Sequence, residues 1–477
     1  MTFLHVVVLL LVAVMGTGVA VTRDPRSQAV VEPGPVQGAI NFAVTNTVGA
    51  VLVLCGIALA YARSGALNLA GMAAGFAGHA DALVAIAFGL ITVGFLVKAA
   101  IVPVHFWLPD AHAVAPTPVC MLFSGVMVLM GLFGVARVYW TAFVWALSPH
   151  LAGLRVILVT LGVVTAALGA VMASSQPHLK RLLAYSSVSH MGVLLCGIGL
   201  LDRDALGAVA LYALGHGLVK AALFAGGGIV LHRLGGVDER RLFGRGRHMR
   251  FTAVLFVIGG LALAGAPPFL LFRGADALEH AARPLGYGWL VVVVVLADGL
   301  TAMAVLRSAA RIFGGLGEAP DASDAPEIPE GRETHGGHGV PWIMLAGGAL
   351  PLVAALGLGL WPGLHEGARR AAATFVGSAA YRAHVLGGAS MPRVELRPPE
   401  PASFGSAAAA VGLAVLLAAL TLGARERGAR ALGPVRELAD GVRQALRRLH
   451  SGHVGDYVAF LTMGAALWLA ALWLVVR

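Results

Sequence analysis

Long apolar stretches separated by short polar segments run through the whole chain. Most are close to the roughly 20 residues that an α-helix needs to cross a bilayer, so the pattern predicts about twelve membrane spans. The predicted spans are 3–21, 40–62, Leu83–Val104, 119–140, 153–173, 182–200, 205–232, 252–282, 288–312, 342–361, 404–422 and 456–476. The sequence therefore predicts an all-α polytopic membrane protein.

Two of these spans contain proline in their interior. Pro103 lies near the end of Leu83–Val104, and the segment Leu263-Ala-Gly-Ala-Pro-Pro-Phe269 interrupts 252–282. Proline lacks an N–H group and clashes with the preceding turn, so each span should be a broken helix. Paired broken helices are typical of transporters with inverted repeats, whose pathway lies near the bilayer midplane.

The remaining segments predict linkers and surface helices. Residues 313–341 combine acidic residues with prolines, which suits a disordered linker. Apolar residues recur at helical spacing opposite arginines in Arg425–Leu449, as in an amphipathic helix at a membrane surface, and part of 363–403 fits a short helix of the same kind. We divide the chain into an N-terminal helix and linker (1–39), a first unit (40–140), a five-helix second unit (153–312), the acidic linker (313–341) and the C-terminal helices (342–477).

The composition agrees with a membrane protein and limits the cofactors and partners that the chain is expected to bind. Charged residues make up only 12% of the chain against about 25% in soluble domains, and the mean hydropathy is +0.82. The net charge of +10 sits mainly in loops, with no aromatic interleaving that would suit nucleic acid. The three cysteines lie in separate apolar helices, and no Gly-rich nucleotide loop follows a strand. We therefore expect no metal, no redox cofactor and no nucleic-acid partner.

A few ionisable residues lie within or beside the predicted spans and are the candidate functional residues. Charge in a bilayer is costly, so such residues usually mark ion or proton pathways, although a lysine near a helix end can also extend to the surface. His216 and Lys220 are four residues apart and share one helix face. We expect Lys98 and Lys220 to face a common polar interior with His190 and His216. The full candidate set is Lys98, His190, His216, Lys220, Arg273, Asp276 and Asp298.

Several motifs resemble a known family. They are Lys98-Ala-Ala, Pro103-Val-His-Phe-Trp-Leu-Pro-Asp-Ala-His112, Ala115-Pro-Thr-Pro-Val119 and Ser124-Gly-Val-Met-Val128; the second forms an interfacial motif with His105, Trp107, Asp110 and His112. The chain resembles the antiporter-like membrane subunits of respiratory complex I, of membrane-bound hydrogenases of the hydrogenase-4 type and of Mrp-type multi-subunit Na⁺/H⁺ antiporters. The resemblance is strong over about residues 40–315.

The resemblance implies a subunit that conducts protons or Na⁺ through buried Lys and His residues within a larger membrane complex. Each five-helix unit of that family is one half-channel, and Lys220 matches the lysine that links the two. Two other functions stay open: a scaffold subunit that no longer translocates ions, and a membrane partner in energy-coupled inorganic carbon uptake. The expected partners are other subunits of such a complex and the lipid bilayer of the cell (inner) membrane.

The chain departs from the family pattern in its first unit and near its second helix break. No membrane acid precedes Lys98, Leu129 stands where the family often has an ionisable residue, and Ala275 stands where a lysine or glutamate is usual. The first unit also has four predicted helices, counting 3–21, where the second has five. The resemblance therefore implies an incomplete first half-channel and a more complete second one.

The arginine distribution predicts the orientation in the membrane. Residues 3–21 fit a signal peptide or an uncleaved helix, and the positive charges that follow at Arg23 and Arg26 favour an uncleaved helix with its N-terminus outside. The loops 22–39, 174–181, 233–250 and 423–455 are then cytoplasmic and carry most loop arginines, whereas the long 363–403 segment is the exception.

We predict that both termini lie on the outer side of the membrane. A reporter enzyme that works only outside the cytoplasm should be active when it is fused after Arg477. A reporter that works only in the cytoplasm should be active when it is inserted in loop 233–250. A reporter after Arg477 that is active only in the cytoplasm would contradict this topology.

Overall fold

The computed structural model describes residues 33–76, 81–317, 319, 339–340, 342–387, 402–423, 441 and 454–476. The predicted span 3–21 lies outside the described residues. So do most of the predicted acidic linker and all but one residue of the predicted amphipathic helix Arg425–Leu449.

Helices make up nearly all of the described chain, and nine of them are long and apolar enough to cross a membrane. The long ones are α2 (Pro33–Ser64), α6 (Thr117–Leu122) continued by α7 (Val128–Val138), α8 (Leu151–Ser174), α9 (Leu179–Gly199), α10 (Arg203–Leu234), α13 (Leu290–Ala309), α14 (Trp342–Leu360), α17 (Gly405–Gly423) and α19 (Val454–Val476). The shorter ones are α3 (Leu69–Gly75), α4 (Ala82–Lys98), α5 (Trp107–Val114), α11 (Arg250–Leu263), α12 (Leu270–Ala282), α15 (Pro362–Val376) and α16 (Ser378–Gly387). The predicted all-α, multi-span fold is confirmed, with nine membrane-length helices in this part of the chain against about twelve predicted spans.

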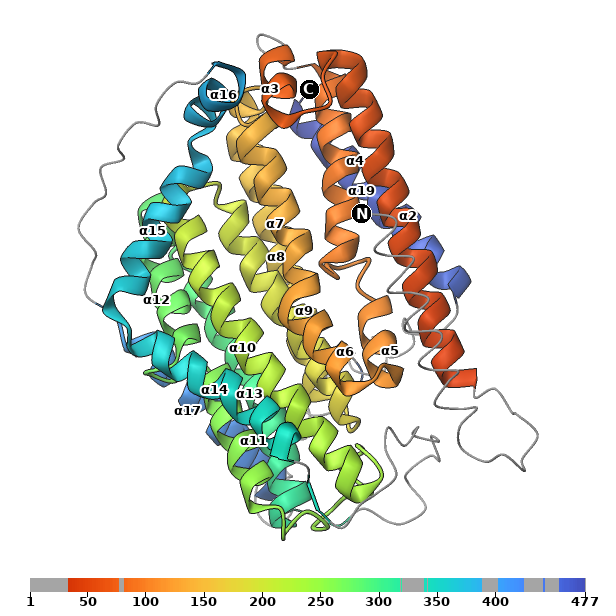
Figure 1. The fold of residues 1–477 in the computed structure, drawn as a ribbon, viewed down its shortest axis with the longest axis vertical. Coiled ribbons are helices and arrows are strands. Elements are labelled where there is room, and N and C mark those ends of the chain that lie inside the picture. The colour runs from red at the N-terminus through yellow and green to blue at the C-terminus, as the bar shows by residue number, and fades with distance from the viewer. Residues whose placement is uncertain are drawn as a thin grey trace.

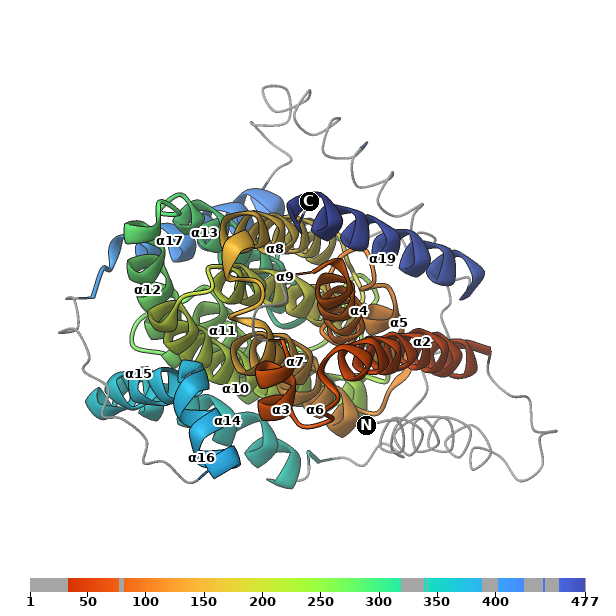
Figure 2. The same cartoon turned by 90° about the horizontal axis from the view of Figure 1, so that it is seen from above.

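Helix α9 forms the centre of the bundle. Every residue from Leu182 to Leu200 is buried, and Figure 2 shows α9 enclosed by α4, α7, α8, α10 and α13. The α14 and α17 helices lie at the edges and are mostly exposed. Polar side chains on α9 are thus shielded from lipid on all sides.

Small residues let α8 approach α9 closely. A methyl group added to Gly192 would collide with the backbone of α8 at Ala166, and one added to Gly169 would collide with the backbone of Ser189. The Ser189 hydroxyl donates a hydrogen bond of 2.8 Å to the carbonyl of Ala166. Because lipid tails are as apolar as leucine, close packing and interhelical hydrogen bonds of this kind hold membrane helices together.

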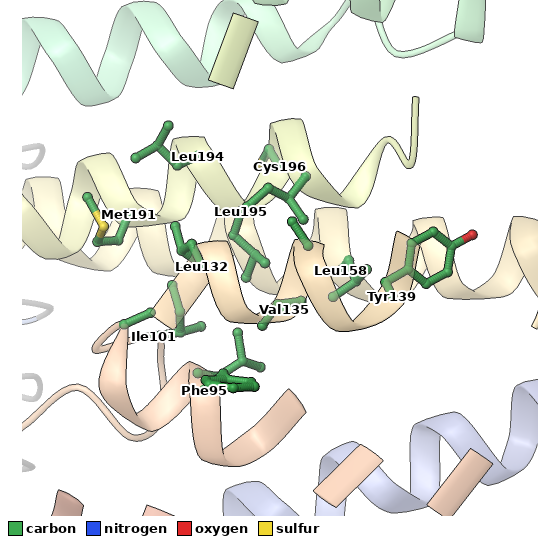
Figure 3. Packing of buried hydrophobic residues seen from close by; sticks show 14 of the residues in the cluster. Phe95, Ile101, Leu132, Val135, Tyr139, Leu158, Met191, Leu194, Leu195 and Cys196 are labelled. Carbon is green, nitrogen blue, oxygen red and sulfur yellow. The ribbon is translucent and has the colours of Figure 1, made fainter. Parts of the chain in front are cut away.

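Apolar side chains join the first part of the chain to α9. Figure 3 shows Leu132 and Val135 of α7 between Phe95 and Ile101 on one side and the leucines of α9 on the other. All of these side chains are buried within one continuous cluster. The packing fixes α4 and its break against the centre of the bundle.

The first proline break follows α4 directly. Ala100 takes a left-handed conformation with φ 54°, and the Ile101 N–H donates back to the Leu96 carbonyl at 3.1 Å. The Val97 carbonyl accepts a 2.9 Å hydrogen bond from Trp107 Nε1, and the Val102 N–H donates to Thr165 Oγ1 at 3.2 Å. Side chains thus satisfy backbone groups that the interrupted helix leaves free, as a membrane interior requires.

The second break repeats the backbone pattern of the first. Gly265 has φ 71°, and the Ala266 N–H donates back to the Leu261 carbonyl at 3.0 Å. Gly265 lies 165 residues after Ala100, and Pro268 lies 165 residues after Pro103. In Figure 1, α4 leads down into its break whereas α11 leads up into its own. The two breaks are therefore locally alike and run in opposite directions.

The segment after α14 packs along the bundle as two helices. Helix α15 lies against α10, and α16 lies near α3 (Figures 1 and 2). Arg369 of α15 is buried, with its Nε 3.7 Å from the Asp204 carboxylate at the start of α10. The short helix expected within 363–403 is therefore present, but it rests on protein along much of its length.

We predict that Trp107→Phe destabilises the protein by about 1–3 kcal/mol, because it removes the hydrogen bond to Val97 and some buried volume at the first break. The measurement is the free energy of unfolding of the protein in mixed micelles, obtained by titration with a denaturing detergent. Trp342→Phe is the matched control, since Trp342 is 74% exposed at the start of α14. An equal loss of unfolding free energy in the two variants would contradict a stabilising role for the hydrogen bond from Trp107 to Val97.

Candidate functional site

Facing polar side chains form a ladder between the antiparallel helices α9 and α10. On α10, Tyr212, His216 and Lys220 recur every four residues, and on α9, Ser186 and His190 do the same. Residues four apart share a helix face, so the two stripes can meet along the interface. All five residues are buried, which places a row of polar groups at the centre of the protein.

One end of the ladder is a hydrogen-bonded group around His190. Its Nδ1 lies 2.7 Å from the Tyr212 hydroxyl, and its Nε2 lies 3.2 Å from Thr301 Oγ1. The Tyr212 hydroxyl donates a 2.7 Å hydrogen bond to Asp298 Oδ1, which is itself 3.6 Å from His190 Nδ1. Both histidine nitrogens therefore have partners, and the α13 carboxylate is tied to α9 through a tyrosine.

The other end of the ladder is Lys220. Its Nζ donates a 2.7 Å hydrogen bond to the Leu183 carbonyl and a further bond to Ser186 Oγ. His216 stands between the two ends, with its ring centre 4.9 Å from that of His190. Neither His216 ring nitrogen has a hydrogen-bond partner among the described residues. Buried polar groups are almost always hydrogen-bonded to protein or water, so His216 marks a position that suits water.

A second polar contact leads from the ladder toward the first unit. Ser187 Oγ lies 2.6 Å from Ser124 Oγ, in the π-helical turn Phe123–Met127 between α6 and α7. His112 of α5 is fully buried and stacks on Phe224 of α10 with ring centres 4.7 Å apart. Lys180 Nζ donates to the Ala115 carbonyl at 3.0 Å. The loop after the first break thus packs directly on α9 and α10.

The other expected residues lie away from the ladder. Lys98 is the last residue of α4 and is partly buried, and α7 and α9 lie between α4 and the helices α10–α13 in Figure 2. Asp276 of α12 accepts a 2.6 Å hydrogen bond from the Ser403 N–H and lies 3.5 Å from His280 Nδ1. Arg273 makes no hydrogen bond or ion pair with another described residue. The structure therefore brings His190, His216, Lys220 and Asp298 together and leaves Lys98, Arg273 and Asp276 elsewhere.

The motif after the first break is mostly buried. His105, Trp107 and His112 are each less than 2% exposed. Asp110 joins three helices: it accepts hydrogen bonds from Asn41 Nδ2 of α2 at 3.1 Å and from the Tyr457 hydroxyl of α19 at 2.7 Å. Its other oxygen lies 3.5 Å from Arg181 of α9. These residues fix the loop in place between helices.

The sequence analysis missed two groups of residues. Tyr212 and Thr301 complete the hydrogen bonds of His190, and Tyr212 continues the four-residue spacing of His216 and Lys220, which was a usable signal. The buried carboxylate of Glu239 lies 3.2 Å from Arg307 and 2.9 Å from Arg311. That second group joins loop 235–249 to the end of α13, and no motif pointed to it.

Nothing in the described part of the chain gathers three or more His, Cys, Asp or Glu side chains in a way that could hold a metal ion. Cys55, Cys120 and Cys196 are free thiols on separate helices. Hydrogen bonds among side chains and to backbone carbonyls hold the ladder and Asp298 together. The His, Tyr, Asp and Lys side chains in it can each gain or lose a proton.

Comparison with known proteins gives a family match over more than half of the chain. The model of the family described as "NADH:quinone oxidoreductase/Mrp antiporter, TM" matches residues 32–301. The chain is 34% identical over 291 residues to NAD(P)H-quinone oxidoreductase chain 4 2 of Thermosynechococcus vestitus, covering 58% of this chain and 52% of that protein. It is 29% identical over 313 residues to hydrogenase-4 component B of Escherichia coli, and the match covers 61% of this chain and 46% of that protein. The chain thus spans about half the length of these curated relatives.

Solved structures show the same fold. A chain of the Mrp complex from Dietzia sp. DQ12-45-1b has a TM-score of 0.62 and 27% identity, over 74% of this chain and 71% of that one. A chain of respiratory complex I from Thermus thermophilus has a TM-score of 0.53 and 24% identity, over 76% and 74%. Both of these chains come from multi-subunit membrane complexes.

Positive charge gathers around His178, which precedes α9 at the arginine-rich end of the bundle. His178 Nδ1 accepts a 3.3 Å hydrogen bond from the Arg181 N–H and so caps α9. Burial, with a smaller contribution from the charges of Arg181 and Lys180, lowers the pKa of His178 to about 3. The neutral imidazole is the form that can accept the capping hydrogen bond.

We predict that stability falls as the pH drops below about 6.5, because the unfolded chain then binds a proton at His178 that the folded protein excludes down to about pH 3. The contribution is about 1.4 kcal/mol per pH unit within that window. The measurement is unfolding free energy between pH 8 and pH 4 for the wild type and for His178→Asn, which keeps a capping oxygen. His178→Asn should reduce the slope by about 1.4 kcal/mol per pH unit, with His248→Asn in the nearby loop as the control; an unchanged slope would contradict the prediction.

Proposed function

This chain belongs to the NADH:quinone oxidoreductase/Mrp antiporter family, and on that premise we propose that it conducts protons, or Na⁺, as a membrane subunit of a larger complex of the NADH–quinone oxidoreductase, hydrogenase or Mrp type. The observation that carries the proposal is the buried ladder between α9 and α10, together with Asp298 of α13, which Tyr212 ties to it. Ionisable groups in a membrane interior are costly, and a row of them is typical of proton relays.

The ladder has the chemistry of a proton relay along most of its length. A histidine can accept a proton at one ring nitrogen and release one from the other, and His190 has a partner at each. A proton leaving Asp298 can pass through the Tyr212 hydroxyl to His190. From there, water beside the unpaired nitrogens of His216 would carry it to Lys220, whose three N–H groups reach Ser186 and Leu183.

The two helix breaks support an inverted repeat around this ladder. Their backbone patterns match at a constant spacing of 165 residues, and they run in opposite directions in Figure 1. In the proposed arrangement residues 153–312 form the complete half-channel. Residues 40–140 form an incomplete half-channel, which the Ser124–Ser187 contact joins to the complete one. Arg273 and Asp276 of α12 would serve the outer end of the complete half-channel.

The surroundings of Leu129 favour a second candidate function, a scaffold subunit that no longer translocates ions. Leu129 lines an apolar cavity, so at this position the first unit offers no ionisable side chain to continue a relay toward Lys98. This candidate and the conducting subunit differ in one measurable respect, since only the conducting subunit needs its ladder for transport. We propose the same setting for both: the cell (inner) membrane, beside other membrane subunits.

We predict that Lys220→Ala lowers proton uptake by the assembled complex below about one tenth of the wild-type rate, which corresponds to a barrier higher by about 1.4 kcal/mol. Lys98→Ala should have a smaller effect, because its unit is incomplete. The measurement is proton uptake into vesicles that contain the assembled complex, with assembly checked by size-exclusion chromatography.

Arg370→Ala is the control for loss of a positive charge, because Arg370 is mostly exposed and pairs with Glu366 on the surface of α15. If Lys98→Ala abolishes uptake while Lys220→Ala leaves it intact, the proposed pathway is wrong. If all three variants transport like the wild type in an assembled complex, the scaffold function is correct.

A further inference from the structure

An apolar cavity of about 370 Å³ lies on one side of the bundle, at the meeting of α7, α9, α10 and α15. It holds about twelve times the volume of one liquid water and falls within the usual range of ligand pockets. Its walls are almost entirely hydrocarbon, and they include Leu129, Phe133, Val209 and Phe375. A cavity of this chemistry excludes water and accepts an apolar chain.

The cavity opens toward the surroundings of the protein along α7. Val126, Met130 and Phe133 line it and are each more than 40% exposed. These side chains lie on a helix long and apolar enough to cross a membrane, so in the single chain they face the bilayer. A molecule entering the cavity from that side is therefore one that already resides in the bilayer.

A cation stands next to the cavity. The guanidinium of Arg137 lies 5.1 Å from the ring centre of Phe375, which lines the cavity, and 4.8 Å from that of Tyr381. The rings hold the guanidinium in place by cation–π attraction, which does not use its N–H donors. Arg137 makes no hydrogen bond or ion pair with another residue in the described ranges. Three neighbouring arginines differ: Arg203 and Arg369 lie near Asp204, and Arg370 pairs with Glu366.

The position of Arg137 along its helix matches the level of lipid headgroups. At a rise of 1.5 Å per residue, it lies about 30 Å from Thr117, where the helix begins. The hydrocarbon core of a bilayer is also about 30 Å thick. Tryptophan is enriched at membrane interfaces, and Trp145 lies two turns further on, where its Nε1 donates to Ser378 Oγ at 3.1 Å.

We propose that this cavity and Arg137 form a binding site for an anionic phospholipid, with one acyl chain in the cavity and the phosphate on the Arg137 guanidinium. A guanidinium with no acidic partner among the described residues is matched by a phosphodiester, which accepts two parallel hydrogen bonds from it. Arg137 contacts Tyr381 of α16, and Figure 1 shows α16 at the opposite end of the bundle from α11, which follows the arginine-rich loop 233–250. The lipid joins α7 of the first unit to α15 of the C-terminal part.

The test uses a phosphatidylglycerol analogue with a photoreactive group on its acyl chain, added to membranes that contain the assembled complex. Crosslinks should map to peptides of α7, α10 and α15, and unlabelled phosphatidylglycerol should compete about tenfold better than phosphatidylcholine. Arg137→Gln should lower the labelling about tenfold, whereas Arg370→Gln should leave it unchanged.

A second pair of variants tests the cavity itself. Ala210 lines the cavity from an exposed position on α10, so Ala210→Trp should fill it and abolish labelling while the complex still assembles. Val156→Trp on the exposed face of α8 is the matched control. Labelling that does not depend on Arg137 or Ala210 would overturn the proposal. So would a crosslink, formed through a photoreactive residue at position 210, to a helix of a neighbouring subunit.

Discussion

A broken helix inside a membrane leaves backbone N–H and C=O groups that hydrocarbon cannot satisfy, and the rest of this structure depends on how those groups are paired. Around the first break, Trp107 bonds the Val97 carbonyl and Thr165 bonds the Val102 N–H. Both partners come from segments that must themselves be held in place. The loop after the break is therefore buried against α8, α9 and α10, and Asp110 ties it to α2 and α19.

That burial also makes the polar ladder possible. A lysine, two histidines and an aspartate can remain in the interior only if α9 and α10 present hydrogen-bonding groups to them at the correct height. The antiparallel pairing does so, because Ser186 faces Lys220 and His190 faces Tyr212. Close contact of α8 with α9 then keeps lipid and bulk water away from the back of the ladder. The polar row and the small residues around it thus depend on each other.

The helices and their breaks could be predicted from apolar run lengths and from Pro103 and Pro268, because bilayer thickness and proline geometry act on local sequence. The pairing of His216 with Lys220 followed from a spacing of four. What the sequence could not supply was which helix each stripe faces. Thr301 reaches His190 across 111 positions, and Glu239 meets Arg307 across a loop, so those contacts depend on tertiary packing alone.

The two halves of the molecule differ in where they place an ionisable residue relative to the helix break. The breaks match at an interval of 165 residues, yet Lys98 at the first corresponds to Leu263 at the second. The ionisable group beside the backbone of the second break is Asp298 of α13, whose carboxylate lies close to Gly265. On α7 the corresponding stretch lines an apolar cavity. The two halves thus have similar backbones, but the ionisable side chain comes before the break in one half and lies beside the break in the other. The repeat therefore keeps the backbone geometry of the break, while the local sequence of each half decides where the ionisable group lies.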